Sequence, residues 1–179
     1  MDNLKYFLVD YWWSLIFIFI LIGFLSFKNK HRFRVKKGNQ ILKRIRGFKG
    51  ENLEKRIISY LQKIDPFTFE EMLLTLFEES GAKIYRNKRY TGDGGIDGKF
   101  KYKGKYYLIQ AKRYKKYINP KDVQKFSELC RIKKVKGLFI HTGIAGKLSN
   151  DIATNSDNII IIHPNELVKF IKGEPIIIF

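Results

Sequence analysis

The chain has 179 residues and a formal charge of +18, with 35 Lys or Arg against 17 Asp or Glu, and 45% of its residues are hydrophobic. This composition excludes an acidic disordered tail and a collagen-like fibre, and the length suits one domain with an appendage. Because Cys130 is the single cysteine, an internal disulfide framework is excluded as well. So large a positive charge indicates a polyanionic partner, for which nucleic acid and anionic lipid are the two candidates.

An uncharged run extends from Tyr11 to Phe27 and carries Trp12 and Trp13 next to its first residue. Its 17 residues lie at the low end of the length that crosses a bilayer as a helix. We interpret the run as an uncleaved transmembrane helix, and the basic residues after it place the rest of the chain on the cytoplasmic side of the cell (inner) membrane. The competing interpretations are a cleaved signal peptide, which here lacks a basic start and a small-residue cleavage site, and a buried core helix.

We interpret residues 28–49 as a basic juxtamembrane linker that lies on anionic headgroups. The alternative is that its charge only sets the orientation of the preceding helix in the membrane. Residues 50–64 follow as a connecting helix, because Leu53, Ile57 and Leu61 recur at helical spacing.

The remaining residues, 65–179, read as one α/β domain with a mixed central sheet, because helical and strand-like segments alternate. Asp65 and Pro66 supply an N-cap and a first-turn proline for the domain's first helix, and Gly81 ends it. The other predicted elements are strands at 82–89, 95–102, 105–113, 137–142 and 158–163, and helices at 120–134, 146–156 and 164–172.

A hairpin brings several polar residues together in this domain. If Lys103 and Gly104 form a two-residue turn, strand pairing places Asp97 opposite Gln110. Lys112 returns to the face of Gln110 by strand alternation. We therefore expect a carboxylate, an amide oxygen and an amine to converge, provided that no bulge shifts the register.

The first helix of the domain adds another acid. Glu70 shares the core-facing helical spacing with Leu73 and Phe77, whereas Glu71 falls with Thr75 on the side expected to face water. A carboxylate on the core-facing side needs a partner, a proton or a metal ion, unless it lies at the edge of that side and reaches water.

Three segments together resemble the Mrr-type restriction endonuclease domain, a branch of the PD-(D/E)xK nuclease superfamily, over roughly residues 65–172. They are FEEMLLTLFEESGAKI, GDGGIDG and QAKRY. The resemblance implies a three-layer α/β/α domain that cleaves DNA with a divalent metal ion, and it makes Glu70, Asp97, Gln110 and Lys112 the catalytic residues. In two departures from the wider superfamily, Ile96 stands at the signature proline and Gln110 stands where most members have an acid; glutamine is usual in Mrr-like members.

These residue types suit phosphodiester cleavage, because Mg²⁺ (or Mn²⁺) prefers hard oxygen ligands. Asp97 would be the main ligand, with the Gln110 amide oxygen, the Ala111 backbone carbonyl and Glu70 as further ligands. Lys112 would position the attacking water or stabilise the developing charge. Asp93 is assigned to closing a turn.

The predicted DNA contacts are cations around this site. Lys99 and Lys101 share strand parity with Asp97, so they are expected on the catalytic face, although a merely solvated lysine face is the alternative. Arg113, Lys115 and Lys116 extend the same surface.

The sequence thus predicts a membrane-anchored, Mg²⁺-dependent DNA endonuclease, with restriction of foreign or modified DNA implied by the resemblance alone. The alternative is a non-catalytic DNA-binding module of the same fold that tethers DNA at the membrane. The expected partners of the protein are DNA and the membrane, and a homodimer is one arrangement that we consider.

Overall fold

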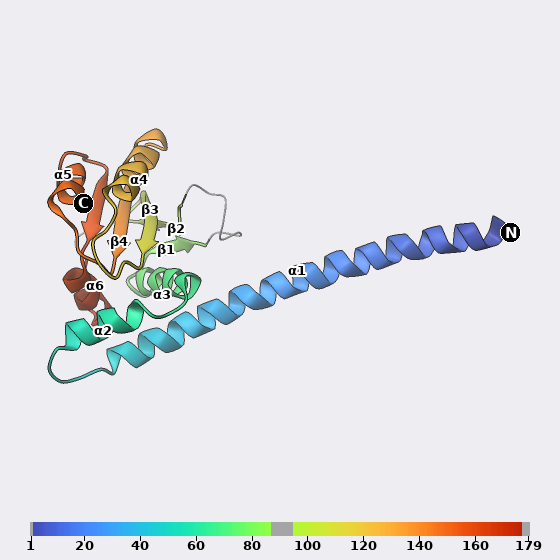
Figure 1. Cartoon of the computed structure of the whole chain (residues 1–179), viewed down its shortest axis with the longest axis horizontal. Coiled ribbons are helices and arrows are strands. Elements are labelled where there is room, and N and C mark those ends of the chain that lie inside the picture. Colours follow the sequence, from blue (N-terminus) through green and yellow to red (C-terminus); the bar gives the residue numbers. More distant parts are fainter. Residues whose placement is uncertain (1, 87–94, 177–179) are drawn as a thin grey trace.

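The computed structural model describes residues 2–86 and 95–176, with side chains for all of these except 2–11 and 23–30. A long N-terminal helix leads into an α/β domain (Figure 1). The helices and strands predicted in that domain are present close to their predicted positions, and residues 87–89 of the predicted strand 82–89 lie outside the described residues. In chain order the elements are α1 Asp2–Arg46, α2 Leu53–Leu61, α3 Pro66–Glu79, β1 Lys83–Tyr85, β2 Gly98–Tyr102, β3 Lys105–Lys112, α4 Pro120–Ile132, β4 Lys136–His141, α5 Lys147–Thr154, β5 Ile159–Ile162 and α6 Pro164–Ile171.

The five strands form one mixed sheet in the order β1-β2-β3-β4-β5, as the alternating pattern predicts. β1, β2 and β3 pair antiparallel, whereas β3, β4 and β5 pair parallel. The predicted hairpin register holds, since Tyr102 pairs with Lys105. Lys103 and Gly104 have φ values of 46° and 82°, so both central residues adopt the left-handed conformation of a tight hairpin turn.

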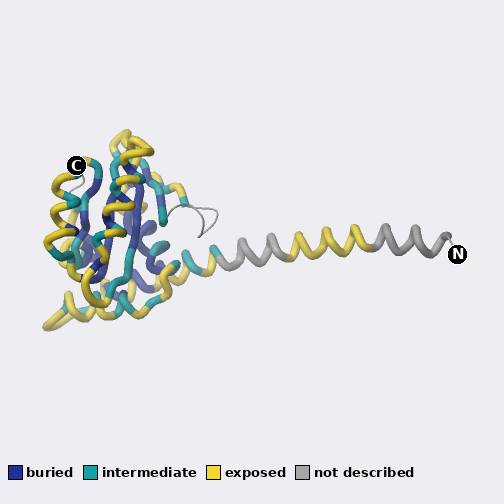
Figure 2. The backbone as a smooth tube through the Cα atoms, turned by 45° about the horizontal axis from the view of Figure 1, so that its top comes forward, coloured by how far each residue is buried: buried dark blue, intermediate teal, exposed yellow. Residues whose placement is uncertain are grey.

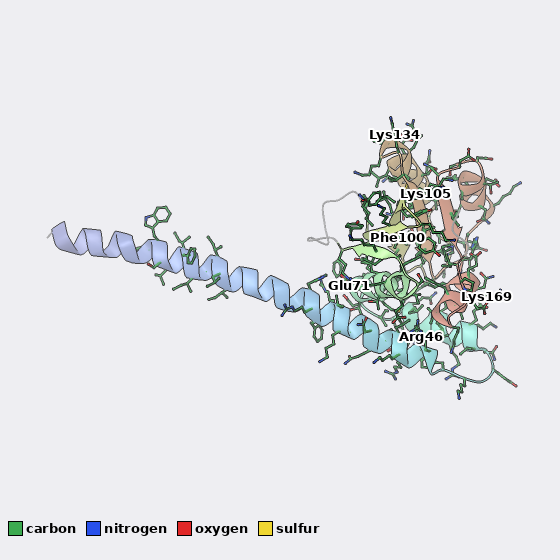
Figure 3. All side chains as sticks on the ribbon, turned by 180° about the vertical axis from the view of Figure 1, so that it is seen from behind. Arg46, Glu71, Phe100, Lys105, Lys134 and Lys169 are labelled. Atoms are coloured by element: carbon green, nitrogen blue, oxygen red, sulfur yellow. The ribbon has the colours of Figure 1, made fainter. Side chains whose placement is uncertain are left out.

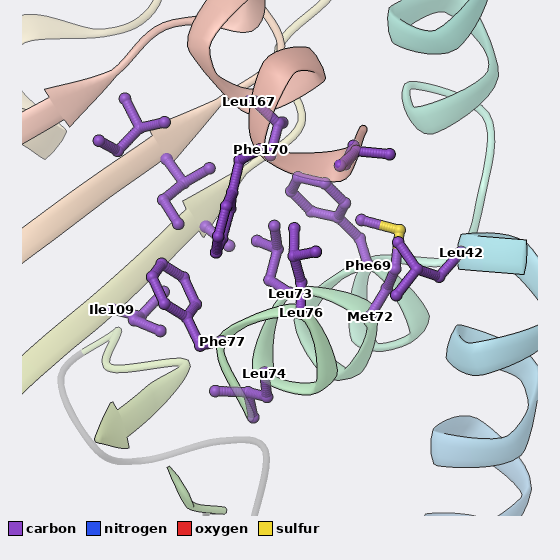
Figure 4. Close-up of a cluster of buried hydrophobic side chains, with 14 of the residues drawn as sticks. Leu42, Phe69, Met72, Leu73, Leu74, Leu76, Phe77, Ile109, Leu167 and Phe170 are labelled. Atoms are coloured by element: carbon purple, nitrogen blue, oxygen red, sulfur yellow. The ribbon is translucent and has the colours of Figure 1, made fainter. Parts of the chain in front are cut away.

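Helices cover both faces of the sheet, and each face has its own hydrophobic core. Figure 2 shows the buried parts of the backbone inside the domain and the exposed parts around them. One core joins the sheet to α1, α2, α3 and α6, and Figure 4 shows its centre around Phe77 and Phe170. The other core joins the opposite face to α4 and includes Phe126, Cys130 and Phe139. The domain is therefore layered with helices on either side of the sheet.

The C-terminal part of α1 belongs to the first core, which corrects the prediction of a linker over residues 28–49. Ile41, Leu42 and Ile45 are buried with at most 6% exposure. Gly38 lets the two backbones approach, because a Cβ there would lie 3.0 Å from the Met72 nitrogen in α3. The buried positions recur at helical spacing between exposed basic residues, so the charge hid an amphipathic helix from the sequence pattern.

Helix α3 is buried on two sides, which corrects a second prediction. It begins as predicted, with the Asp65 side chain accepting a hydrogen bond from Thr68 N at 2.9 Å. Glu71 and Thr75, expected in water, are only 2% and 7% exposed. The sheet covers one side of α3 and α1 covers another, whereas the sequence argument assumed a single covered side.

The predicted membrane span, residues 11–27, lies in the N-terminal part of α1. Side chains are described there for residues 12–22, and all of these residues are exposed. Among the described residues, no helix qualifies by length and apolar character as one that could cross a membrane.

Candidate active site

The four predicted catalytic residues come from three neighbouring elements. Glu70 lies in α3, Asp97 directly precedes β2, and Gln110 and Lys112 lie near the end of β3. Asp93 lies outside the described residues. Since β2 pairs with β3 and α3 packs in the core beneath them, these elements deliver the side chains to one end of the hairpin.

A bulge at Asp97 modifies the predicted geometry. Gly98 pairs with Ile109, yet the Asp97 nitrogen also donates to the Ile109 carbonyl at 2.9 Å, so two residues of one strand oppose one of the other. The Asp97 carboxylate consequently accepts a hydrogen bond from Ala111 N at 2.6 Å instead of facing Gln110 directly. Asp97 thus still meets β3, but at Ala111 and not at Gln110, one residue further along the strand.

The close approach of α3 to β2 brings Glu70 near Asp97. A Cβ on Gly98 would lie 2.3 Å from Leu74 Cδ2, so any larger residue there would force the buried Leu74 side chain to move. Burial, together with the negative charge of Asp97, raises the pKa of Glu70 to about 8. Glu71 and Asp65 raise it further, and the positive charge of Arg34 opposes them. Glu70 is half-buried among carboxylates, an environment that a bound cation would relieve.

The side-chain amide of Gln110 is buried with its nitrogen hydrogen-bonded and its oxygen without a partner among the described residues. Its Nε2 donates to the Gly95 carbonyl at 2.9 Å, and the residue is 6% exposed. Gly95 has a φ of +86°, and a Cβ there would lie 2.6 Å from Gln110 Nε2. Within the described part of the chain, the buried Gln110 Oε1 has no hydrogen-bond partner. An unpartnered buried amide oxygen is costly, which suits a role as a cation ligand.

Ala111 and Lys112 complete the arrangement on β3. The N–H and C=O of one residue in an antiparallel strand point to the same side, so the Ala111 carbonyl faces the side on which its nitrogen meets Asp97. Lys112 is half-buried and pairs in register with His141 of β4. Burial, followed by the charge of His163, lowers the pKa of His141 to about 4. Lys112 therefore has a neutral imidazole as its neighbour at pH 7.

The donors present fit Mg²⁺ or Mn²⁺ better than a transition metal. Among the described residues, which omit 87–94, no three His, Cys, Asp or Glu side chains converge as a metal cluster. The available ligands are instead two carboxylates, one amide oxygen and one backbone carbonyl, from Glu70, Asp97, Gln110 and Ala111. Such a set of hard oxygens, completed by water, is the type that Mg²⁺ prefers.

The predicted DNA contacts occupy different environments. The Lys99 ammonium lies 4.2 Å and the Lys101 ammonium 5.4 Å from the Tyr106 ring centroid, on the face opposite the buried Phe100. The extra residue at the bulge interrupts the alternation of side chains between the two faces of the sheet. Lys99 and Lys101 therefore cannot be placed on the face of Asp97 from their odd residue numbers alone. Their contact with DNA stays a prediction.

The three cations after β3 also differ from one another. Arg113 Nη1 donates to the carbonyls of Gln62 and Ile64, which ties it to the end of α2. Lys115 and Lys116 are exposed. Arg113 thus has a structural contact that the sequence pattern did not reveal, whereas the two lysines remain predicted DNA contacts.

Sequence reasoning missed two residues of α1 that approach this site. His31 Nδ1 lies 3.4 Å from Glu71 Oε1, and the Arg34 guanidinium lies 4.2 Å from the ring centroid of Phe67. The signal was present, since residues 31, 34, 38, 41 and 45 follow the spacing of a helix-packing seam.

Comparisons with known proteins bear on the fold and the family of this chain. No curated protein matches the chain. A structure of the MspJI restriction endonuclease in complex with a 27-mer oligonucleotide is similar, with a TM-score of 0.54 and 20% identity over 69% of this chain, which shows a shared fold. The match spans 32% of that longer chain. A restriction endonuclease family model of the Mrr catalytic type matches residues 61–171, and because this is more than half of the sequence, the chain belongs to that family.

Proposed function

We propose that this protein is a Mg²⁺- or Mn²⁺-dependent endonuclease that hydrolyses phosphodiester bonds in DNA. The observation that carries the proposal is the buried Oε1 of Gln110, unpartnered among the described residues, which lies on β3 directly before the residue whose nitrogen holds the Asp97 carboxylate. The charge of that carboxylate also acts on Glu70. Membership of the restriction endonuclease family and the fold shared with a DNA-bound enzyme support the choice of DNA as substrate.

The residues would divide the chemistry between them. Glu70, Asp97, the Gln110 amide and the Ala111 carbonyl would hold the metal ion, which supplies charge neutralisation at the phosphate when bound. The hydrogen bond from Ala111 N at 2.6 Å orients the Asp97 carboxylate before any ligand arrives. The Lys112 ammonium would orient the attacking water or stabilise the negative charge that develops on the phosphate.

A plasmid assay tests this proposal. The full chain in neutral detergent is incubated with supercoiled plasmid, with and without Mg²⁺, beside Asp97→Ala and Lys112→Ala. Asp151→Ala and Lys147→Ala serve as controls, because both residues are exposed on α5. We expect metal-dependent nicking by the wild type and both controls, and its loss in the two site variants. DNA binding without nicking in any of them would instead favour the non-catalytic DNA-binding module.

We further propose that α1 anchors the enzyme in the cell (inner) membrane, with the domain on the cytoplasmic side. The support is the exposed apolar surface over residues 12–22, where Trp13 is 70% and Phe19 82% exposed. So large an exposed apolar surface needs a nonaqueous environment or a partner. Flotation of the full chain with liposomes tests the anchor, and release by alkaline carbonate would refute it.

A homodimer and a role in restricting foreign or modified DNA stay predictions. Light scattering in detergent measures the oligomeric state. Comparing methylated with unmethylated plasmid in the nicking assay tests whether modification matters.

A further inference from the structure

A basic groove of about 650 Å³ lies between α1 and the ends of α3 and β1. Arg32, Lys36, Lys43 and Arg86 line it, and Glu78 is the acid among its lining residues. Glu78 already bridges Arg86 at 2.8 Å, so the remaining cations leave the groove strongly positive. Three of these cations come from α1, which precedes residues 61–171 that match the endonuclease family.

A buried carboxylate fixes the walls of this groove. Glu71, labelled in Figure 3, is 2% exposed. It accepts a hydrogen bond from Arg86 Nε at 3.1 Å and lies 3.4 Å from His31 Nδ1. Glu71 therefore links His31 of α1 and Arg86, the residue after β1, to α3 in one polar network. This network and the close contact of Gly38 with α3 hold α1 against α3. The cations of α1 are therefore held in place relative to the rest of the domain.

The groove adjoins the candidate active site. Glu71 follows Glu70 in α3, and it contacts two residues that line the groove, His31 and Arg86. Arg34, on the same helix as the groove cations, packs over Phe67 one turn before Glu70. A polyanion whose phosphate reached Glu70 and Asp97 could therefore continue over α1.

Two polyanions could occupy the groove, and the geometry favours DNA over a lipid surface. At about 1.5 Å per residue, Lys36 and Lys43 lie roughly 14 and 24 Å along α1 beyond Phe27, where the predicted span ends. The headgroup layer adds about 5–8 Å on each side of the hydrocarbon core, which leaves Lys36 at about the Debye length of 8 Å at physiological salt and Lys43 well beyond it. Headgroups at the end of the span would thus be screened from Lys43, which lies deeper along the groove.

We propose that this groove binds the phosphate backbone of DNA on one side of the cleaved bond, with Lys36 and Lys43 as contacts. The inference rests on the proposed function in that DNA is the polyanion. It makes α1 a second DNA-binding wall, supplied from outside the part of the chain that matches the family.

Charge-matched double variants test the groove. Lys36→Gln with Lys43→Gln removes two groove cations, whereas Lys37→Gln with Arg44→Gln removes two exposed cations of α1 that do not line it. Affinity for a short DNA duplex is measured by fluorescence anisotropy without divalent metal, over a range of salt concentrations. Losing two phosphate contacts should lower the slope of log affinity against log salt by about 1.8, because each contributes about 0.9. The control pair should leave the slope unchanged.

Equal slopes for the two double variants would overturn the inference, and so would a wild type that does not bind the duplex. Loss of binding to anionic vesicles with unchanged DNA affinity would assign the groove to lipid and overturn it as well. Thermal unfolding of each variant checks that the fold is kept. Because binding is measured without metal, a wild type that binds DNA but never nicks plasmid would refute the proposed enzyme while leaving the groove assignment standing.

Discussion

Replacing Leu42 by alanine should show that the end of α1 is part of the domain core. Leu42 is 1% exposed and belongs to the core between α1 and α3. Truncating a fully buried leucine costs about 2–5 kcal/mol, from lost burial plus the cavity that remains. For a chain of this size, each kcal/mol lowers Tm by about 2–4 °C, so the shift should be about 4–20 °C.

Leu148→Ala is the matched control, because this leucine in α5 is 61% exposed and the chemical change is identical. Thermal unfolding of the full chain in neutral detergent, followed by circular dichroism, measures both variants. We expect the control to stay within about 0.5 kcal/mol of the wild type. If Leu42→Ala unfolds with the control, the end of α1 contributes no packing and residues 28–49 act as the linker that the sequence suggested.

Three further outcomes follow from contacts in the domain. Gly98→Ala should cost about 1–3 kcal/mol in chemical unfolding, since its Cβ would lie 2.3 Å from Leu74 Cδ2; a neutral effect would contradict the close approach of α3 to β2. Gly95→Ala should displace the Gln110 side chain and raise the Mg²⁺ concentration needed for half-maximal nicking, and an unchanged metal titration would argue against Gln110 as a ligand. The Cys130 thiol, buried and with a pKa raised by burial to about 12, should react with a thiol reagent only after denaturation, and rapid labelling of the native chain would exclude this burial.

Sequence reasoning succeeded where local chemistry decides the structure. The turn at Lys103 and Gly104 set the hairpin register, and the Asp65 cap set the start of α3. Both features depend on residues adjacent in the sequence, so a pattern can reveal them. The grouping of Asp97 with β3 residues followed from the same register.

Sequence reasoning failed where an element distant in the sequence decides whether a residue is buried or what it contacts. The bulge at Asp97 inserts one residue that no local pattern marks, and it moved the carboxylate to Ala111 N. Glu71 was assigned to water because α3 was expected to bury one side, whereas α1 covers another. The charge of residues 28–49 suggested a solvated linker, although residues 31, 34, 38, 41 and 45 recur at helical spacing and are buried or half-buried. Tertiary contacts override each of these local signals.

The protonation of Glu70 gives a last prediction that links the site to stability. Burial and the charge of Asp97 raise the folded-state pKa of Glu70 to about 8, from an ordinary value of 4.5. Between these pH values the folded state binds more protons than the unfolded state, so the stability that protonated Glu70 contributes is complete below about pH 4.5 and falls as pH rises towards 8. Because the carboxyl is half-buried, solvent screening reduces the size of this effect.

Glu70→Gln removes this titration while keeping the shape of the side chain. Without metal, the free energy of unfolding of the variant should therefore rise relative to the wild type as pH increases from 5 to 8, and the difference isolates Glu70 from other titrating groups. Added Mg²⁺ favours the ionised carboxylate, so it should raise the Tm of the wild type more at pH 8 than at pH 6. A difference between the two proteins that stays constant with pH would mean that Glu70 is ordinarily ionised, and the crowding of carboxylates that suits it to a metal ion would lose its support.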